Sequence, residues 1–218
     1  MRKGVTPSAA CLSALALCVG MAPAASAAAP KEPPPGRITI QVLSMNGSGC
    51  PPHTAAVAAA EDNTAFTVTY SEHTAQAGGN SSPADQRKFC QLDLGVHVPQ
   101  GFTYAIAGTD YRGYAKLADG ASGLVRAVYY HQGVSRTTSV SHTIHGKYSK
   151  SWQFTDRNPV AELVWKPCGE DRNFHIDAEL RVDEGTSKPE ETSFISFDST
   201  DSRFGTVYHF EWKQCPGH

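Results

Sequence analysis

The chain has 218 residues, 40% of them hydrophobic and 18% charged, and its formal net charge is −2. A charge this close to zero argues against nucleic acid or an anionic membrane surface as the partner, because both select strongly basic proteins. The length is sufficient for one domain with a sizeable core.

The N-terminus has the pattern of a secretory signal peptide. Arg2 and Lys3 precede an apolar run from Ala9 to Met21, and small residues follow this run. The run is shorter than the roughly 20 residues that a membrane-spanning helix needs. The order predicts a signal peptide at residues 1–27 and therefore a secreted, extracellular protein with no membrane span. Residues 28–36 are proline-rich, which predicts an extended and mobile spacer.

From residue 37 onward, apolar and polar residues alternate with a period of two, as is typical of strands with one buried and one exposed face. The expected strands are 37–42, 66–70, 92–98, 102–107, 111–117, 125–131, 138–144, 152–155, 162–165, 174–182, 192–197 and 207–212. Residues 54–61 fit a short helix and a strand equally well. Many short strands without an internal repeat predict an all-β fold, an antiparallel two-sheet sandwich or jelly roll, in one domain at residues 37–218.

Four cysteines remain once the leader is removed: Cys50, Cys90, Cys168 and Cys215. In an oxidising compartment this number predicts two disulfides, for which three connectivities exist. If the strands at 174–182 and 207–212 are neighbours, Phe174 lies opposite Phe210 and the cysteines beyond the two strands approach each other. The same argument applies to the first strand and the strand at 92–98. We therefore predict the bridges Cys50–Cys90 and Cys168–Cys215.

The same strand pairing would gather charged groups on one outward sheet face. They are His175, Asp177, Glu179 and Arg181 on one strand, and His209, Glu211 and Lys213 on the other. Two carboxylates near a histidine can support glycoside hydrolysis, with Glu179 and Glu211 as the candidate catalytic residues. Alternating charges are, however, usual on any solvated sheet face.

Other catalytic and metal-binding patterns are missing from the sequence. It contains no nucleophile elbow, no phosphate-binding glycine loop and no H-E-x-x-H helix. The pair His142 and His145 has helical spacing but lies at an expected strand end, where residues three apart point to opposite faces. We therefore expect no cofactor and no metal, and we favour a non-enzymatic protein over a secreted glycan-active hydrolase.

The tyrosines in the middle of the chain are the candidate binding residues. Exposed tyrosines stack on sugar rings or anchor protein partners. Tyr129 and Tyr130 are adjacent in one expected strand, so they point to opposite faces and at least one of them faces outward. Around Asp110 a connection between strands would present Tyr111, Arg112 and Tyr114 as a ligand loop. The alternative is a structural corner in which these tyrosines cover the core.

These features favour an extracellular binding or interaction module for a glycan or a protein surface. A structural or toxin-like secreted factor fits the same features. Ligand, host and oligomeric state are left open by the sequence.

Several segments also carry a resemblance. The most specific block is Val98–Ala107, followed by Asp110–Ala115; shorter matches are Gly47–Pro52, Ala65–Tyr70, Cys90–Leu92, Pro167–Gly169 and Trp212–Cys215. Together they resemble DUF4360, a domain of unknown function found in secreted proteins of actinobacteria and fungi. The resemblance implies a secreted single domain with two cysteine pairs, and it implies no activity and no catalytic residues.

Overall fold

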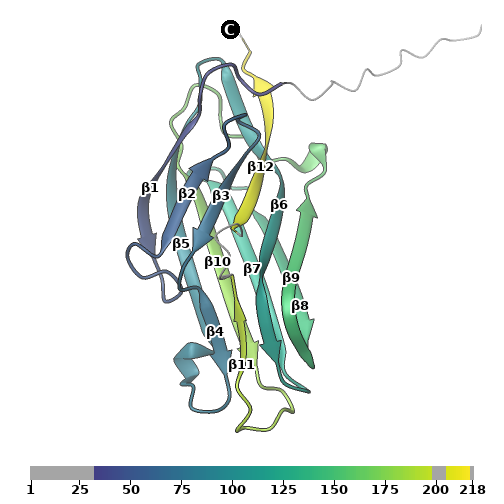
Figure 1. Ribbon diagram of the computed structural model, residues 1–218. Helices are drawn as coiled ribbons and strands as arrows, with labels where there is room; N and C mark the ends of the chain where they lie inside the picture. The colour runs from purple at the N-terminus through teal and green to yellow at the C-terminus, as the bar shows by residue number, and fades with distance from the viewer. Residues whose placement is uncertain (1–31, 198–204, 217–218) are drawn as a thin grey trace, which may run out of the picture.

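The computed structural model describes residues 32–197 and 205–216, so the expected signal peptide lies outside the described residues. Two antiparallel sheets pack face to face, which confirms the all-β sandwich (Figure 1). The five-stranded sheet has the order β1 (Thr39–Asn46), β5 (Arg87–His97), β10 (Phe174–Asp183), β7 (Ser122–His131) and β8 (Thr138–His145). The seven-stranded sheet has the order β2 (Ala55–Ala59), β3 (Ala65–Tyr70), β12 (Thr206–Gln214), β6 (Phe102–Leu117), β11 (Ser193–Ser196) and β4 (Thr74–Ala77), with β9 (Tyr148–Arg157) on β6. Two short 3₁₀ turns are η1 (Pro83–Asp85) and η2 (Val160–Glu162).

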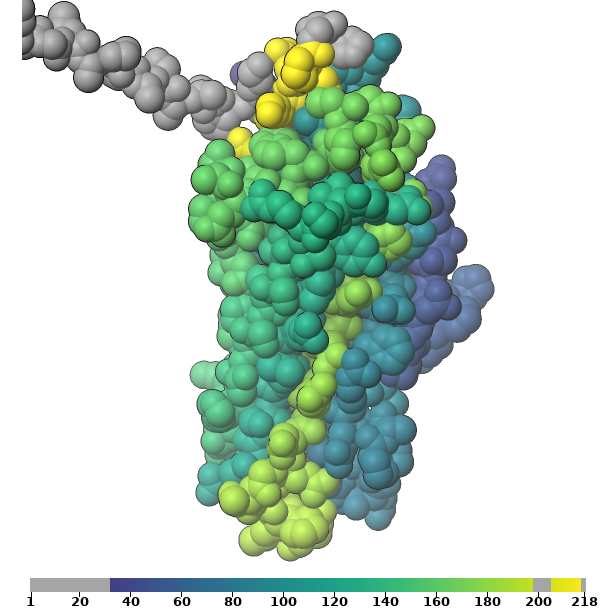
Figure 2. Space-filling view, turned by 180° about the vertical axis from the view of Figure 1, so that it is seen from behind, coloured from purple at the N-terminus to yellow at the C-terminus, as the bar shows by residue number. Residues whose placement is uncertain are grey.

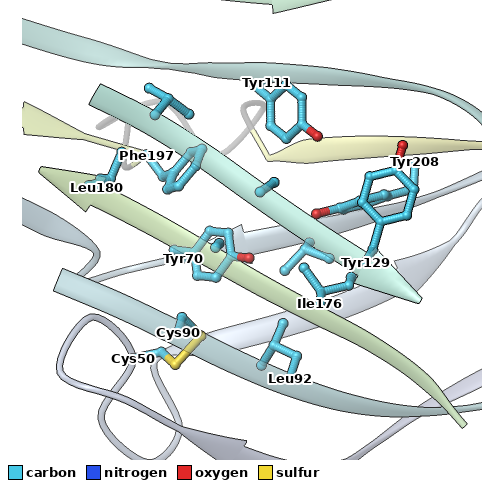
Figure 3. Packing of buried hydrophobic residues seen from close by; sticks show 14 of the residues in the cluster. Cys50, Tyr70, Cys90, Leu92, Tyr111, Tyr129, Ile176, Leu180, Phe197 and Tyr208 are labelled. Carbon is cyan, nitrogen blue, oxygen red and sulfur yellow. A yellow bond between two sulfur atoms is a disulfide. The ribbon is translucent and has the colours of Figure 1, made fainter. Parts of the chain in front are cut away.

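The core lies between the sheets and is built from alternate residues of each strand. In β10, Phe174, Ile176 and Leu180 are at most 1% exposed, as the period of two requires. From the other sheet, Phe66 and Tyr208 stack with ring centroids 4.8 Å apart, and the Phe174 ring meets Phe66 edge-on at 6.2 Å. Figure 3 shows Ile176 and Tyr208 in this layer. Burying each of these large side chains stabilises the fold by about 2 to 3 kcal/mol.

The strands differ from the expectation at several places, and β4 at Thr74–Ala77 was not expected. Residues 54–61 contain the strand β2, so the strand alternative is correct. Residues 162–165 were expected to be a strand, but Val160–Glu162 form η2 and Leu163–Trp165 belong to no strand. The connection expected around Asp110 is wrong as well, because β6 is continuous from Phe102 to Leu117. The pairing of β6 with β12 contains a register shift between His209 and Phe210, where a β-bulge interrupts the ladder.

The expected pairing of β10 with β12 is also wrong. β10 lies between β5 and β7, whereas β12 lies between β3 and β6 in the other sheet. Phe174 and Tyr208 therefore meet across the sandwich, at 6.5 Å between ring centroids, rather than within one sheet. Two apolar strand faces satisfy the same sequence pattern whether they are neighbours or opposite layers.

Both predicted disulfides are confirmed. Cys50 bonds to Cys90 and Cys168 bonds to Cys215, with S–S distances of 2.03 Å and 2.08 Å. The first bridge ties the connection after β1 to its neighbour β5 inside the core (Figure 3). The second bridge ties the end of β12 to the segment before β10, and it therefore links the two sheets at one end of the sandwich.

The last residues of the expected spacer are held by the domain. The Asn63 side-chain amide donates hydrogen bonds to the carbonyls of Pro34 and Gly36, at 3.1 Å and 2.7 Å, and its oxygen accepts one from the Ile38 amide. Pro34 is buried. The expected mobility is therefore wrong for residues 34–36. Within the described ranges, no helix is long and apolar enough to span a bilayer.

Removing the first bridge by the double substitution Cys50→Ala and Cys90→Ala should lower the free energy of unfolding by about 3 to 4 kcal/mol. The reason is the entropy that the unfolded chain regains when a loop of 40 residues is opened. Guanidinium unfolding of the variant and the wild type measures this difference. A loss below about 1 kcal/mol would contradict the structural role given to this bridge.

Candidate functional site

The five candidate binding residues lie in three different environments. Tyr111 and Tyr129 belong to the core and are 1% and 3% exposed, so we correct the expectation that they contact a ligand. Arg112 and Tyr114 point outward from the seven-stranded sheet. Tyr130 is partly exposed on the outer face of the five-stranded sheet, as the split of the Tyr129–Tyr130 pair across the strand requires.

Tyr114 is held by its neighbours on the seven-stranded sheet. Its ring stacks on Phe194 at 6.0 Å, and its hydroxyl forms a hydrogen bond of 3.1 Å with the Ser149 hydroxyl. Both Tyr114 and Arg112 pair with β9 in a regular ladder. The expected ligand loop is thus a rigid sheet surface.

The two candidate catalytic carboxylates do not share a face. Glu179 points outward from the five-stranded sheet and Glu211 points outward from the seven-stranded sheet, because β10 and β12 lie in different layers. Their separation removes the constellation that suggested glycoside hydrolysis.

Glu179 has a structural environment. It is 7% exposed, and its two carboxylate oxygens accept charged hydrogen bonds from Arg87 at 2.6 Å and from Arg181 at 2.8 Å. Burial alone would raise the pKa of Glu179, but the two guanidinium groups outweigh it and hold the pKa below its ordinary value of 4.5. A carboxylate held between two arginines stays ionised, so it cannot act as a general acid near neutral pH.

Farther along the same face, Tyr130 forms part of an aromatic platform. The His175 ring stacks on the Tyr130 ring at 4.8 Å with an interplanar angle of 17°. Nδ1 of His175 lies 3.7 Å from Oδ1 of Asp93, and the Asn173 amide donates a hydrogen bond of 3.1 Å to the other carboxylate oxygen. Figure 2 shows this outer face, where yellow-green β10 runs obliquely between teal β7 and blue β5. We call Tyr130, His175, Asp93 and Asn173 the platform.

The platform adjoins an open depression of about 400 Å³. Its lining residues come from β1, β5 and the segment before β10: Thr39, Gln41, Gly95, Val96, His97, Asp171, Arg172 and Asn173. Gly95 lies opposite Gln41 in the ladder, and the Leu43 side chain lies against it. Asn173 belongs to both features, so the platform and the depression form one continuous surface. This surface was missed in the sequence because Asp171–Asn173 are not in a strand and reach β5 only through the tertiary fold.

The opposite sheet carries a second polar cluster, around Asp110 of β6. The carboxylate accepts hydrogen bonds of 2.6 Å from the Thr155 hydroxyl and forms a 2.6 Å contact with Nε2 of His209, and Arg157 lies 3.5 Å away. Burial raises the pKa of Asp110, but these partners outweigh it and the pKa lies below its ordinary value. Each carboxylate oxygen has a partner, so the cluster fastens β6, β9 and β12 together.

Metal binding has no support among residues 32–197 and 205–216, where no three His, Cys, Asp or Glu side chains are grouped closely enough to hold an ion. His142 forms a 2.8 Å contact with Asp156 and stacks on Phe154 at 4.2 Å. This histidine therefore serves the packing of β8 on β9.

The fold, the two bridges and the rigid outer faces define a class: a disulfide-bonded antiparallel β-sandwich without a recognisable catalytic centre in its described part. The chain belongs to the family described as "Domain of unknown function (DUF4360)", whose model matches residues 36–215. A relative from Arthroderma benhamiae, called "Uncharacterized secreted protein", is 31% identical over 183 residues, which are 84% of this chain and 74% of the relative. The protein is thus a member of a secreted family whose function is unknown.

Two solved structures have weak similarity to the chain. One is the enzymatically active domain of bacteriophage CBA120 tailspike protein 4, with 12% identity and a TM-score of 0.25; the match covers 82% of this chain but only 19% of the tailspike chain. The other is the cowpea mosaic virus top component, with 11% identity, a TM-score of 0.23, and coverage of 78% and 86% of the two chains. At these scores neither likeness bears on function.

The substitution Glu179→Gln should lower the free energy of unfolding at pH 7 by about 1 to 2 kcal/mol, because the two arginines lose their charged acceptor. The pKa of Glu179 is lower in the folded protein than in the unfolded chain, so the ionised carboxylate stabilises the fold above about pH 4.5. This contribution disappears as the pH falls through the folded pKa. Urea unfolding between pH 3 and 7 should show a smaller gap between variant and wild type at the acid end, whereas a constant gap would contradict the account.

Proposed function

We propose that this protein is an extracellular glycan-binding module that uses the platform and the adjoining depression. The observation that carries the proposal is the outward Tyr130–His175 ring pair beside the hydrogen-bonding groups of Asp93 and Asn173. Sugar rings present apolar C–H faces that pack on aromatic rings and hydroxyls that need fixed donors and acceptors. A surface with both kinds of group next to each other suits such a ligand.

The depression supports the proposal by its size and its chemistry. Its volume of about 400 Å³ is in the range of small-molecule sites. Its polar groups include the amide of Gln41, the hydroxyl of Thr39 and the carboxylate of Asp171. These groups are attached to sheet strands or to the segment anchored by Asn173, so little ordering is required on binding.

The competing functions have less support. A hydrolase would need paired carboxylates, but Glu179 is occupied by two arginines and Glu211 lies on the other sheet. A large protein interface is centred on a patch of apolar anchors. The large apolar side chains exposed in the described residues are few: Val42 and Leu43 on β1, and Val160 in η2, which follows β9 of the other sheet. A structural or toxin-like role has no specific observation in its favour.

The proposed function includes export. Residues 1–27 would act as the signal peptide and residues 37–218 would form the single binding domain outside the cell. N-terminal sequencing of the protein collected from culture medium should give a mature chain that starts at Ala28.

The substitution Tyr130→Ala should weaken glycan binding about tenfold, because the platform loses its outer ring. Asn173→Ala should have a similar effect, since Asp93 loses the donor that orients it. The matched control is Tyr114→Ala. Tyr114 is also an outward tyrosine stacked on a neighbouring ring, but it lies on the opposite sheet, so its removal should leave the affinity unchanged. A glycan array identifies the ligand, and isothermal titration calorimetry measures the affinity of each variant.

Two outcomes would count against this assignment. If no glycan on the array binds to the wild-type protein, the proposed class of ligand is wrong. If Tyr114→Ala abolishes binding and Tyr130→Ala does not, the glycan site lies on the seven-stranded sheet.

A further inference from the structure

A second pocket lies at the end of the sandwich that carries the Cys168–Cys215 bridge. Its volume is about 240 Å³, and its lining comes from the β5–β6 turn, the segment before β10 and the C-terminal cysteine. Three of its lining residues, Val96, His97 and Asp171, also line the depression of the proposed glycan site. The pocket and the depression are therefore adjoining parts of one surface.

Lys166 is the most unusual residue in this pocket. It is only 6% exposed, although lysine is almost never fully buried without a partner. Its backbone is fixed on both sides, because its amide donates to the Tyr104 carbonyl at 3.0 Å and its carbonyl accepts from the Thr103 hydroxyl at 2.5 Å. Among the described residues, its ammonium group has no hydrogen bond to an acceptor and no ion pair within 4.0 Å.

The neighbouring charges leave this ammonium without a direct partner. Glu170 already forms an ion pair with Arg172. Asp171 is exposed and contributes only at longer range. Burial lowers the pKa of Lys166, and the carboxylates of Asp171 and Glu170 oppose this shift in part. No carboxylate among the described residues pairs directly with this ammonium, so an anionic group of a ligand in the pocket can form its ion pair.

The rest of the pocket wall suits a sugar ring. Pro99 and the partly buried Phe102 supply apolar contact area. Gly101 and Gly169 also line the pocket and contribute no side chain that would fill it. Asp171 stands on the shared wall, where its carboxylate can accept hydrogen bonds from sugar hydroxyls on either side. A free inorganic anion would need only Lys166 and would not use this apolar wall.

We propose that this pocket binds a carboxylated sugar residue, such as a uronic acid, through an ion pair between its carboxylate and the Lys166 ammonium. The inference rests on the proposed glycan-binding function and specifies its ligand: an acidic glycan whose neighbouring residue lies in the depression. Lys166 is then the residue that determines specificity for acidic over neutral chains.

The test compares two polymers that differ only in the carboxylate, polygalacturonate and its fully methyl-esterified form. Wild-type protein, as the full mature chain, should bind the acid at least about tenfold more tightly than the ester, as expected for a charge-assisted hydrogen bond. Lys166→Met should reduce this preference to about threefold or less while keeping the affinity for the ester. Lys188→Met is the matched control, since Lys188 is an exposed lysine in the β10–β11 loop at the other end of the sandwich and should leave the preference intact (Figure 1).

The outcomes separate the inference from the function on which it rests. If wild-type protein binds both polymers equally, or if Lys166→Met keeps the full preference, the role of Lys166 is wrong and glycan binding stands. If neither polymer nor any other glycan binds, the proposed function itself fails. Acetate at the concentration of sugar units should not compete, and full competition would show capture of any carboxylate instead of recognition of a sugar.

A readout that needs no variant guards against a folding defect in Lys166→Met. Raising the salt concentration should weaken wild-type binding of polygalacturonate several-fold and leave binding of the ester almost unchanged, because only the first involves an ion pair. An equal salt effect on both polymers would contradict the proposal.

Discussion

The burial of alternate side chains between the two sheets is the constraint on which the rest of the structure depends. Phe174, Phe66 and Tyr208 meet in the middle of the sandwich, and their contacts fix which face of each strand points inward. A shift of one residue in any of these strands would turn its whole apolar set outward. Once the inward set is fixed, the outward set is fixed as well. The platform on β10 and β7 is a direct consequence, because Tyr130 and His175 lie next to the buried Tyr129 and Phe174.

The same constraint explains why the candidate site combines rigidity with openness. The strands supply fixed outward groups, and the depression lies between β1, β5 and the irregular segment before β10. The Cys168–Cys215 bridge holds this segment against the end of β12, so that Asp171 and Lys166 line their pockets from a tethered stretch of chain. On the opposite sheet, Asp110 binds three strands together and Tyr114 is packed on Phe194, so the polar groups there mainly satisfy one another.

Much of the fold could be predicted from the sequence, because a period of two is a local signal. Most of the strands, the outward position of one residue of the Tyr129–Tyr130 pair and both disulfides were predicted correctly, whereas β4 was missed and no strand forms at residues 162–165. Which strands pair with each other could not be predicted from the sequence, because the apolar face of β10 fits β12 either as a neighbour or as a strand of the opposite sheet. The Cys168–Cys215 prediction was correct despite the wrong pairing, because strands that face each other across the core also bring their ends together. The continuous β6 was missed because its bulge resembles a turn in sequence. The isolation of Lys166 is a property of tertiary packing, which no local pattern reveals.

The central claim is that the outer face of the five-stranded sheet and the adjoining end pocket form the binding surface. Mapping amide chemical shifts of the ¹⁵N-labelled protein during titration with an oligogalacturonate tests it most directly. The account predicts changes concentrated at Gly95, His97, Asp171, Asn173 and His175. Changes at Arg112 and Tyr114, with none at Gly95 and Asn173, would contradict it.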